Sequence, residues 1–116
     1  MSLSIVSIDN MSKILFWQKA RCLFKSSNVV SIKKLGNTFF SEKYGIYFFI
    51  LDRGILINSY SNSPEQKEFI SQCISKLFDG KRVAVSGSAC EWLNKENPIQ
   101  NVIIYELSIE KNGEIL

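Results

Sequence analysis

The feature that most constrains the fold is an amphipathic run that begins at Ser63 and ends at Gly80. Ser63 and Pro64 are typical of the N-cap and the first position of a helix, and Gln66 can complete a capping box with Ser63. Gly80 suits the left-handed position that follows a helix. Between these ends, apolar residues recur with the period of one helical face; they are Phe69, Ile70, Cys73, Ile74, Leu77 and Phe78. The pattern predicts a long helix over about 64–79.

An apolar helix face of this length must be buried against another element. Extended segments rich in β-branched and aromatic residues lie on both sides of it, at 3–8, 29–35, 38–41, 44–51, 55–60, 81–86 and 101–110. Short turns join most of these segments, which favours a mainly antiparallel sheet. Residues 44–51 are apolar on both faces, so we expect an interior strand that is covered on both sides. In the last segment the alternation predicts that Ile103, Tyr105, Leu107 and Ile109 point inward.

Residues 13–25 fit two structures. As a helix they gather Phe16, Trp17, Ala20, Leu23 and Phe24 on one stripe. As a strand, their apolar and basic residues alternate between the two sides. Thirteen residues is long for a strand, which favours a helix over about 12–25. A short helix is expected near 89–94. The sequence therefore predicts one α+β domain over residues 1–116, with a mainly antiparallel sheet of about five to six strands.

The charge distribution is uneven. Residues 1–41 hold six basic side chains and one acidic side chain, a net charge of +5, whereas residues 42–116 hold eight basic and ten acidic side chains, a net charge of −2. Such an asymmetry can mark a surface for an anionic partner. The candidate partner-binding residues are Lys13, Trp17, Arg21, Lys25, Lys33 and Lys34. Phosphate contacts by these cations, with stacking on Trp17, would also suit nucleic acid.

The chain has three widely spaced cysteines, no C-x-x-C pair and no histidine. We therefore expect no metal site, no cofactor and no disulfide framework, with the thiols buried. The best place for chemistry is the stretch from Gly87 to Cys90, which follows a strand and opens a helix, where a thiol pKa can be depressed. A Cys90 nucleophile would still need a base, and the usual one is missing. We expect no catalytic residue and no enzymatic activity.

No apolar segment reaches the roughly 18 residues that cross a bilayer, and the first ten residues lack the basic start of a secretory signal. We expect a cytoplasmic protein that does not act at a membrane. The leading hypothesis is a small protein-binding protein that acts through its surface, one form being an inhibitor or immunity-type protein that blocks the active site of a toxin or enzyme. The alternatives are a nucleic-acid-binding module that uses the basic N-terminal third, and an enzyme with Cys90 as nucleophile.

Overall fold

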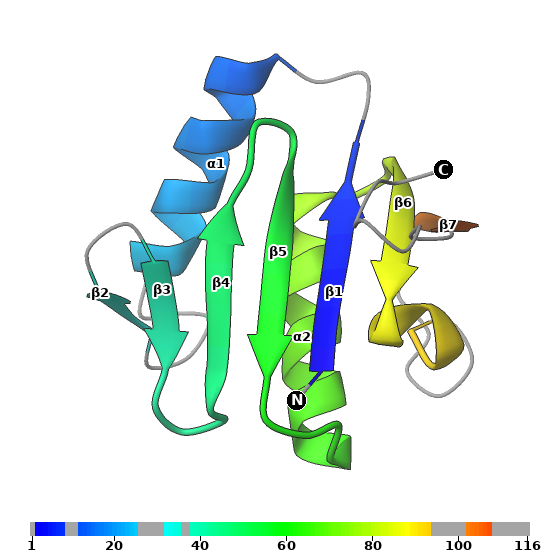
Figure 1. The fold of residues 1–116 in the computed structure, drawn as a ribbon. Helices are drawn as coiled ribbons and strands as arrows, with labels where there is room; N and C mark the ends of the chain where they lie inside the picture. The colour runs from blue at the N-terminus through cyan, green and yellow to red at the C-terminus, as the bar shows by residue number, and fades with distance from the viewer. Residues whose placement is uncertain (1, 9–11, 26–31, 36–37, 94–101, 108–116) are drawn as a thin grey trace, which may run out of the picture.

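The computed structural model describes residues 2–8, 12–25, 32–35, 38–93 and 102–107, which form one sheet with helices behind it (Figure 1). The strands are β1 (Ser2–Ser7), β2 (Ile32–Leu35), β3 (Thr38–Ser41), β4 (Ile46–Ile50), β5 (Gly54–Ser59), β6 (Arg82–Gly87) and β7 (Ile103–Leu107). The helices are α1 (Lys13–Lys25), α2 (Pro64–Leu77) and the short 3₁₀ helix η1 (Ser88–Glu91).

The strands form a seven-stranded sheet in the order β2-β3-β4-β5-β1-β6-β7. Every neighbouring pair is antiparallel except β6 and β7, which are parallel. A parallel pair needs a long crossover connection, and the chain between residues 87 and 103 provides it. The α+β class and the mainly antiparallel sheet are confirmed. The sheet has seven strands instead of five to six, because the four-residue strands β2 and β3 both join it.

Helix α2 begins as its sequence predicts. The Ser63 hydroxyl accepts a hydrogen bond from the Gln66 N–H (3.3 Å), and the Gln66 side-chain oxygen accepts one from the Ser63 N–H (3.0 Å). The capping box thus satisfies two of the N–H groups that every helix start leaves without a partner. The helix ends at Leu77, two residues before the predicted end, and Gly80 follows with a φ of 68°.

The ambiguous segment is a helix, as its length favoured. Phe16, Ala20 and Phe24, spaced four residues apart, form the buried line of α1. Leu23 packs beside this line, at the edge of the core. Trp17, in contrast, is 37% exposed, so its predicted place on the buried stripe is wrong. The reason is helical geometry, because a residue next to Phe16 is turned by about 100° around the helix axis.

Both α-helices cover the same face of the sheet. The ring of Phe48 on β4 lies 4.9 Å from that of Phe24 on α1 and 5.9 Å from that of Phe69 on α2, measured between ring centroids. The two helices also meet directly, because Phe16 stacks on Phe78 at 5.5 Å, just past the end of α2. This aromatic contact line holds the two helices and the middle of the sheet together in one core.

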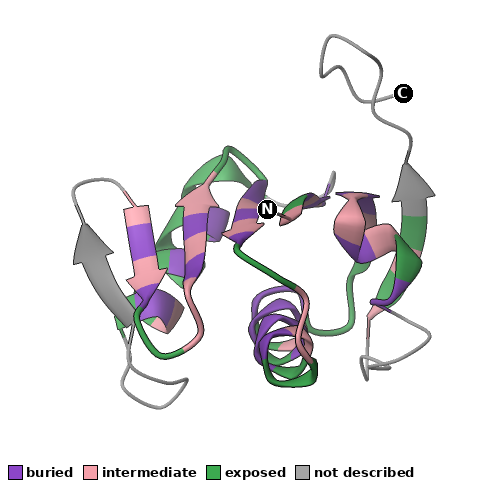
Figure 2. Cartoon of the chain, turned by 60° about the horizontal axis from the view of Figure 1, so that its bottom comes forward, coloured by how far each residue is buried: buried purple, intermediate pink, exposed green. Residues whose placement is uncertain are grey.

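The opposite face of the sheet is turned to the viewer in Figure 1, and no described helix covers it. The strand register places two rows of side chains there. We call these seven residues the open face: Leu3, Ile5, Phe40, Tyr47, Phe49, Leu56 and Asn58. Figure 2 shows the resulting bands, in which buried residues alternate with partly exposed ones along β3, β4 and β5. The expectation that 44–51 would be covered on both sides is therefore wrong for the described part of the chain.

The side chains of β7 point the opposite way from the prediction. Ile103 is 57% exposed and Tyr105 is 39% exposed, whereas Val102 and Ile104 pack against the core. The parallel register explains this, because Ile104 pairs with the buried Val83 and so lies on its side of the sheet. The predicted orientations of Leu107 and Ile109 fall outside the described side chains.

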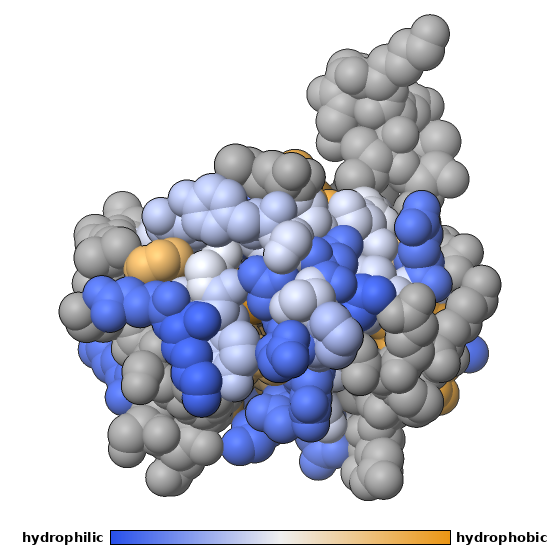
Figure 3. Space-filling view, turned by 90° about the horizontal axis from the view of Figure 1, so that it is seen from below, coloured by the Kyte–Doolittle hydropathy of each residue, from blue (hydrophilic) through white to orange (hydrophobic). Residues whose placement is uncertain are grey.

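A small polar network joins the start of α2 to the turn between β3 and β4. The Gln66 amide donates to the Tyr44 carbonyl (2.6 Å), and the Ser61 hydroxyl donates to the Gln66 side-chain oxygen (2.7 Å). The buried amide of Gln66 is therefore hydrogen-bonded, as burial of a polar group requires. Seen from below, this end of the molecule presents mainly hydrophilic side chains (Figure 3).

The three cysteines have different environments. Cys73 is buried, and burial raises the pKa of its thiol from 9.0 to about 12, an effect that the nearby Lys76 charge partly opposes. Cys90 is half-buried, and Cys22 is exposed on α1, so the expectation of three buried thiols is wrong for Cys22. No described helix is long and apolar enough to cross a membrane.

Candidate functional site

Four of the six predicted partner-binding residues lie on α1. Lys13, Trp17, Arg21 and Lys25 follow one another at intervals of four, and all four are exposed. They lie off the buried line of Phe16, Ala20 and Phe24, and the described residues of α1 include no acidic side chain. The helix therefore presents its positive charge to the surroundings.

Two exposed apolar side chains lie among these cations. Ile14 is 69% exposed and Leu15 is 60% exposed, and both come just before the partly exposed Trp17. These two residues were not among the predicted partner-binding residues. The sequence does carry a signal of their exposure, because neither falls on the four-residue spacing of the buried line. We call the exposed side of this helix the α1 face: Lys13, Ile14, Leu15, Trp17, Lys19, Arg21 and Lys25.

The cations of the α1 face have two specific contacts. The guanidinium of Arg21 lies 5.5 Å from the centroid of the Trp17 ring, a cation–π contact worth about 0.5–1 kcal/mol at an exposed site. The Lys13 ammonium forms an ion pair with Asp52 in the β4–β5 hairpin at 3.2 Å. Both partners of this pair are more than 60% exposed, so water and salt screen it strongly.

The other two predicted residues, Lys33 and Lys34, lie on β2. This edge strand lies beside α1, and its backbone pairs Lys33 with Phe40 and Lys34 with Phe39 on β3. The structure therefore brings the backbone of all six predicted residues to one side of the molecule (Figure 1). The side chains of Lys33 and Lys34 lie outside the described part of the chain.

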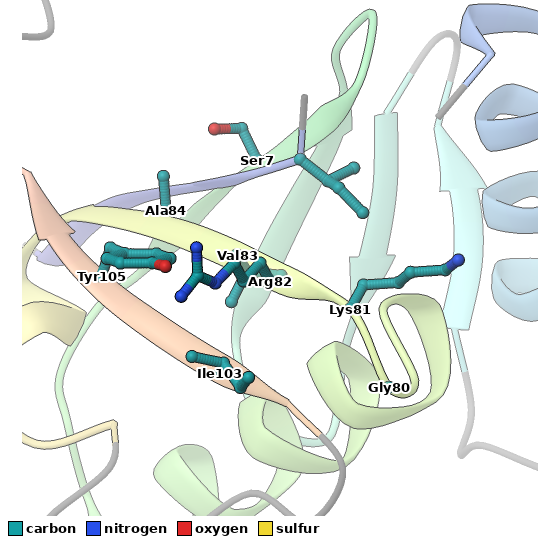
Figure 4. A pocket seen from close by; sticks show the side chains of 9 residues that line it. Ser7, Gly80, Lys81, Arg82, Val83, Ala84, Ile103 and Tyr105 are labelled. Atoms are coloured by element: carbon teal, nitrogen blue, oxygen red, sulfur yellow. The ribbon is translucent and has the colours of Figure 1, made fainter. Parts of the chain in front are cut away.

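A second feature is a shallow hollow of about 610 Å³ at the β6–β7 side of the sheet (Figure 4). Arg82 lies over the ring of Tyr105, with 4.6 Å between the guanidinium carbon and the ring centroid, and Lys81 and Ser7 also line the hollow. None of its lining residues is a carboxylate or a cysteine. The lining thus offers positive charge and hydroxyl groups.

Cys90 is held by its local structure. Its Sγ donates a hydrogen bond to the Val85 carbonyl (2.9 Å), and the Ala89 N–H donates to the Ser4 hydroxyl (2.9 Å). Gly87 has a φ of +89° and packs so tightly on the β1 backbone that a Cβ atom would collide with the Leu3 carbonyl oxygen. The loop thus joins η1 to β1, and two of its groups already have partners within the protein. Among the described residues, no three side chains that could hold a metal ion come together.

Comparison with known proteins finds no matching family model, no matching curated protein and no matching solved structure.

Proposed function

We propose that this chain is a protein-binding protein that uses its α1 face to dock on an acidic surface of another protein. The observation that carries the proposal is the mixture of exposed apolar and basic side chains on one helix. Ile14 and Leu15 would gain free energy by leaving water, and the surrounding cations would select an acidic partner. Trp and Arg, which meet in the Trp17–Arg21 contact, are also the residues that most often dominate protein interfaces.

One detail favours a protein over a nucleic acid. Nucleic-acid binding to a basic surface comes mainly from phosphate contacts, which offer nothing to the exposed aliphatic side chains of Ile14 and Leu15. An acidic protein with an apolar groove satisfies both kinds of side chain together.

One form of this function is inhibition. A helix that projects apolar and basic side chains can fill an acidic active-site cleft, and the partner then loses access to its substrate. We therefore propose an inhibitor or immunity-type role, in which the partner is a toxin or an enzyme with an acidic cleft. This chain would contribute no catalytic group of its own.

Charge reversal on α1 tests the proposal. The variant Lys19→Glu with Arg21→Glu is compared with Lys43→Glu and Arg82→Glu. The control changes the net charge equally and breaks two cation–π contacts, whereas the α1 reversal breaks one. Each protein captures partners from a nuclease-treated lysate of the native host, and the captured protein is purified and tested for direct binding. We expect the α1 reversal to slow association at least about tenfold, since surface charges act mainly on association rates, and the control to bind normally.

Two results would contradict the proposal. One is equal weakening by both double variants, because the α1 face would then have no special role. The other is that nuclease treatment abolishes capture and the purified wild type binds DNA or RNA with an affinity that falls steeply as salt rises. That second result would establish the nucleic-acid alternative in its place.

A further inference from the structure

The hollow at the β6–β7 side of the sheet has a shape that the strand register explains. Ser7 pairs with Ala84, and Ala84 pairs with Tyr105, so these three residues form one row across β1, β6 and β7. Residues that pair directly have their side chains on the same side of the sheet. The methyl group of Ala84 is the smallest side chain of the row and leaves space between Ser7 and Tyr105. The row is two strand spacings wide, or about 10 Å.

Arg82 lies on the same side of the sheet as this row, because it comes two residues before Ala84 on β6. Its guanidinium carbon is 4.6 Å from the centroid of the Tyr105 ring, and Figure 4 shows the guanidinium beside this ring, among the side chains that line the hollow. A ring contact of this kind uses the flat face of the guanidinium. The N–H groups at its edge therefore stay available to a ligand.

The positive charge of the hollow is not balanced by the described residues around it. Within the described part of the chain, Arg82 and Lys81 form no ion pair, and the lining includes no carboxylate. Figure 4 shows Lys81 directed away from Arg82, so Lys81 adds positive potential at the rim, and Arg82 is the cation placed to hold a ligand. The hydroxyls of Ser7 and Tyr105 are further donors. Arginine binds carboxylate and phosphate groups through two parallel N–H bonds, so the matching group is an oxyanion.

We propose that the hollow is a binding site for a small organic oxyanion, a molecule that joins a phosphate or carboxylate group to an apolar ring or chain. The oxyanion meets the edge of the Arg82 guanidinium. The apolar part lies on Ile103, which is 57% exposed, and on the methyl group of Ala84. The volume of about 610 Å³ is within the roughly 300–1,000 Å³ of small-molecule sites. The site is separate from the α1 face, because none of its lining residues belongs to α1.

The test is a titration of the full chain, followed by calorimetry and by the backbone amide signals in nuclear magnetic resonance spectra. The probes are phenyl phosphate and benzoate, with inorganic phosphate and the neutral benzyl alcohol for comparison. We expect both aromatic anions to bind saturably and to shift the amide signals of Ser7, Arg82 and Tyr105. The tighter of the two shows which oxyanion the site prefers. Inorganic phosphate and benzyl alcohol should bind more weakly, because each lacks one of the two recognised parts.

Two substitutions separate the charge of the site from its shape. Arg82→Gln removes the cation and should weaken binding of the aromatic anions at least about tenfold, because hydrogen bonds to charged groups are the strong ones. Ala84→Leu keeps the charge but fills the space between the walls, and it should weaken binding to a similar extent. Lys43→Gln is the matched control, because Lys43 is also an exposed cation over a tyrosine ring, that of Tyr44. Circular dichroism shows that each variant is folded.

Three results would overturn the proposal. One is that neither aromatic anion binds saturably, because the hollow then holds no small molecule of this class. Another is that inorganic phosphate or benzyl alcohol binds as tightly as the aromatic anions, since one of the two proposed contacts would then be missing. The third is that Ala84→Leu leaves binding unchanged, or that Lys43→Gln weakens it as much as Arg82→Gln does, because the anions would then follow only the net positive charge of the chain.

Discussion

The α1 face and the open face are both exposed, but they differ in how their apolar side chains are combined with charge. On α1, three apolar side chains lie among four cations, and no acidic side chain of the helix balances them. On the open face, seven residues across four strands carry no charge at all. The α1 face therefore offers a partner charge and hydrocarbon together, whereas the seven residues of the open face offer almost only hydrocarbon.

The two surfaces should also respond differently to salt. Added salt screens the attraction between α1 and an acidic partner. Salts that are excluded from protein surfaces, such as sulfate, strengthen the burial of apolar groups and so would strengthen an association through the open face. The comparison therefore predicts opposite salt effects on associations through the two surfaces.

The largest expected effect is a difference in stability between a substitution in the buried core and the same substitution on an exposed surface. Ile74→Ala removes a fully buried side chain from α2, and the resulting cavity should lower the free energy of unfolding by about 2–5 kcal/mol. Ile14→Ala makes the same substitution on the α1 face, where the side chain is 69% exposed, and should change stability by less than about 0.5 kcal/mol. Urea unfolding followed by circular dichroism measures both. Equal losses would mean that Ile14 belongs to the core and is not available to a partner.

An intermediate effect is expected from thiol chemistry. Cys22 is exposed on α1 and should react with iodoacetamide in the folded protein, whereas Cys73, whose pKa is raised to about 12, should react only after unfolding. The adduct on Cys22 should block the partner of the α1 face. Mass spectrometry follows the labelling, and Cys22→Ser is the control. Undiminished partner binding after complete labelling of Cys22 would mean that the partner does not dock on the α1 face.

The same pKa gives a dependence of stability on pH. Because the folded state holds the Cys73 proton more tightly than the unfolded chain does, this thiol stabilises the fold fully below about pH 9. Its contribution is lost as the pH rises from about 9 to about 12. Cys73→Ala should flatten the fall of the unfolding free energy in that range.

The smallest effect concerns the ion pair at the start of α1. Asp52→Asn removes the partner of Lys13, and because both side chains are largely exposed the unfolding free energy should fall by less than about 1 kcal/mol. The substitution also makes the surroundings of the α1 face more positive, so association with an acidic partner should become faster. Glu91→Gln, at an exposed position on η1, changes the net charge equally and is the control. An unchanged rate for Asp52→Asn, or an equal gain for Glu91→Gln, would argue against charge selection by α1.

Most of the fold could be predicted from the sequence, because several local signals agreed. At α2 the cap, the proline, the apolar period and the closing glycine all indicated the same helix, and the structure confirms its start at Pro64. The facing of β7 could not be predicted in this way. Its alternation offers two equivalent faces. Only pairing with β6, 21 residues earlier in the chain, selects the face that contains Ile104.

The candidate site was predictable only in part. The charge balance of the N-terminal third selected Lys13, Trp17, Arg21 and Lys25, and the structure places them together on the exposed side of α1. Exposure of Ile14 and Leu15 depends on which line of the helix is buried, and that is decided by aromatic partners on other elements. The open face was beyond the reach of the sequence, because an apolar strand does not reveal whether one or both of its sides will be covered.

The place of β1 in the sheet has a consequence for the order in which the chain folds. This strand precedes β5 and β6 in the chain, yet it lies between them, and its partner residues begin at Gly54 on β5 and Ala84 on β6. The β4–β5 hairpin can form as soon as residues 46–59 leave the ribosome, but β1 must wait for both of its neighbours. Pairing over such sequence distances is slow because a long loop must close first. Until residue 87 has emerged, the edge of β1 that later pairs with β6 has no partner strand, which makes the growing chain prone to aggregation.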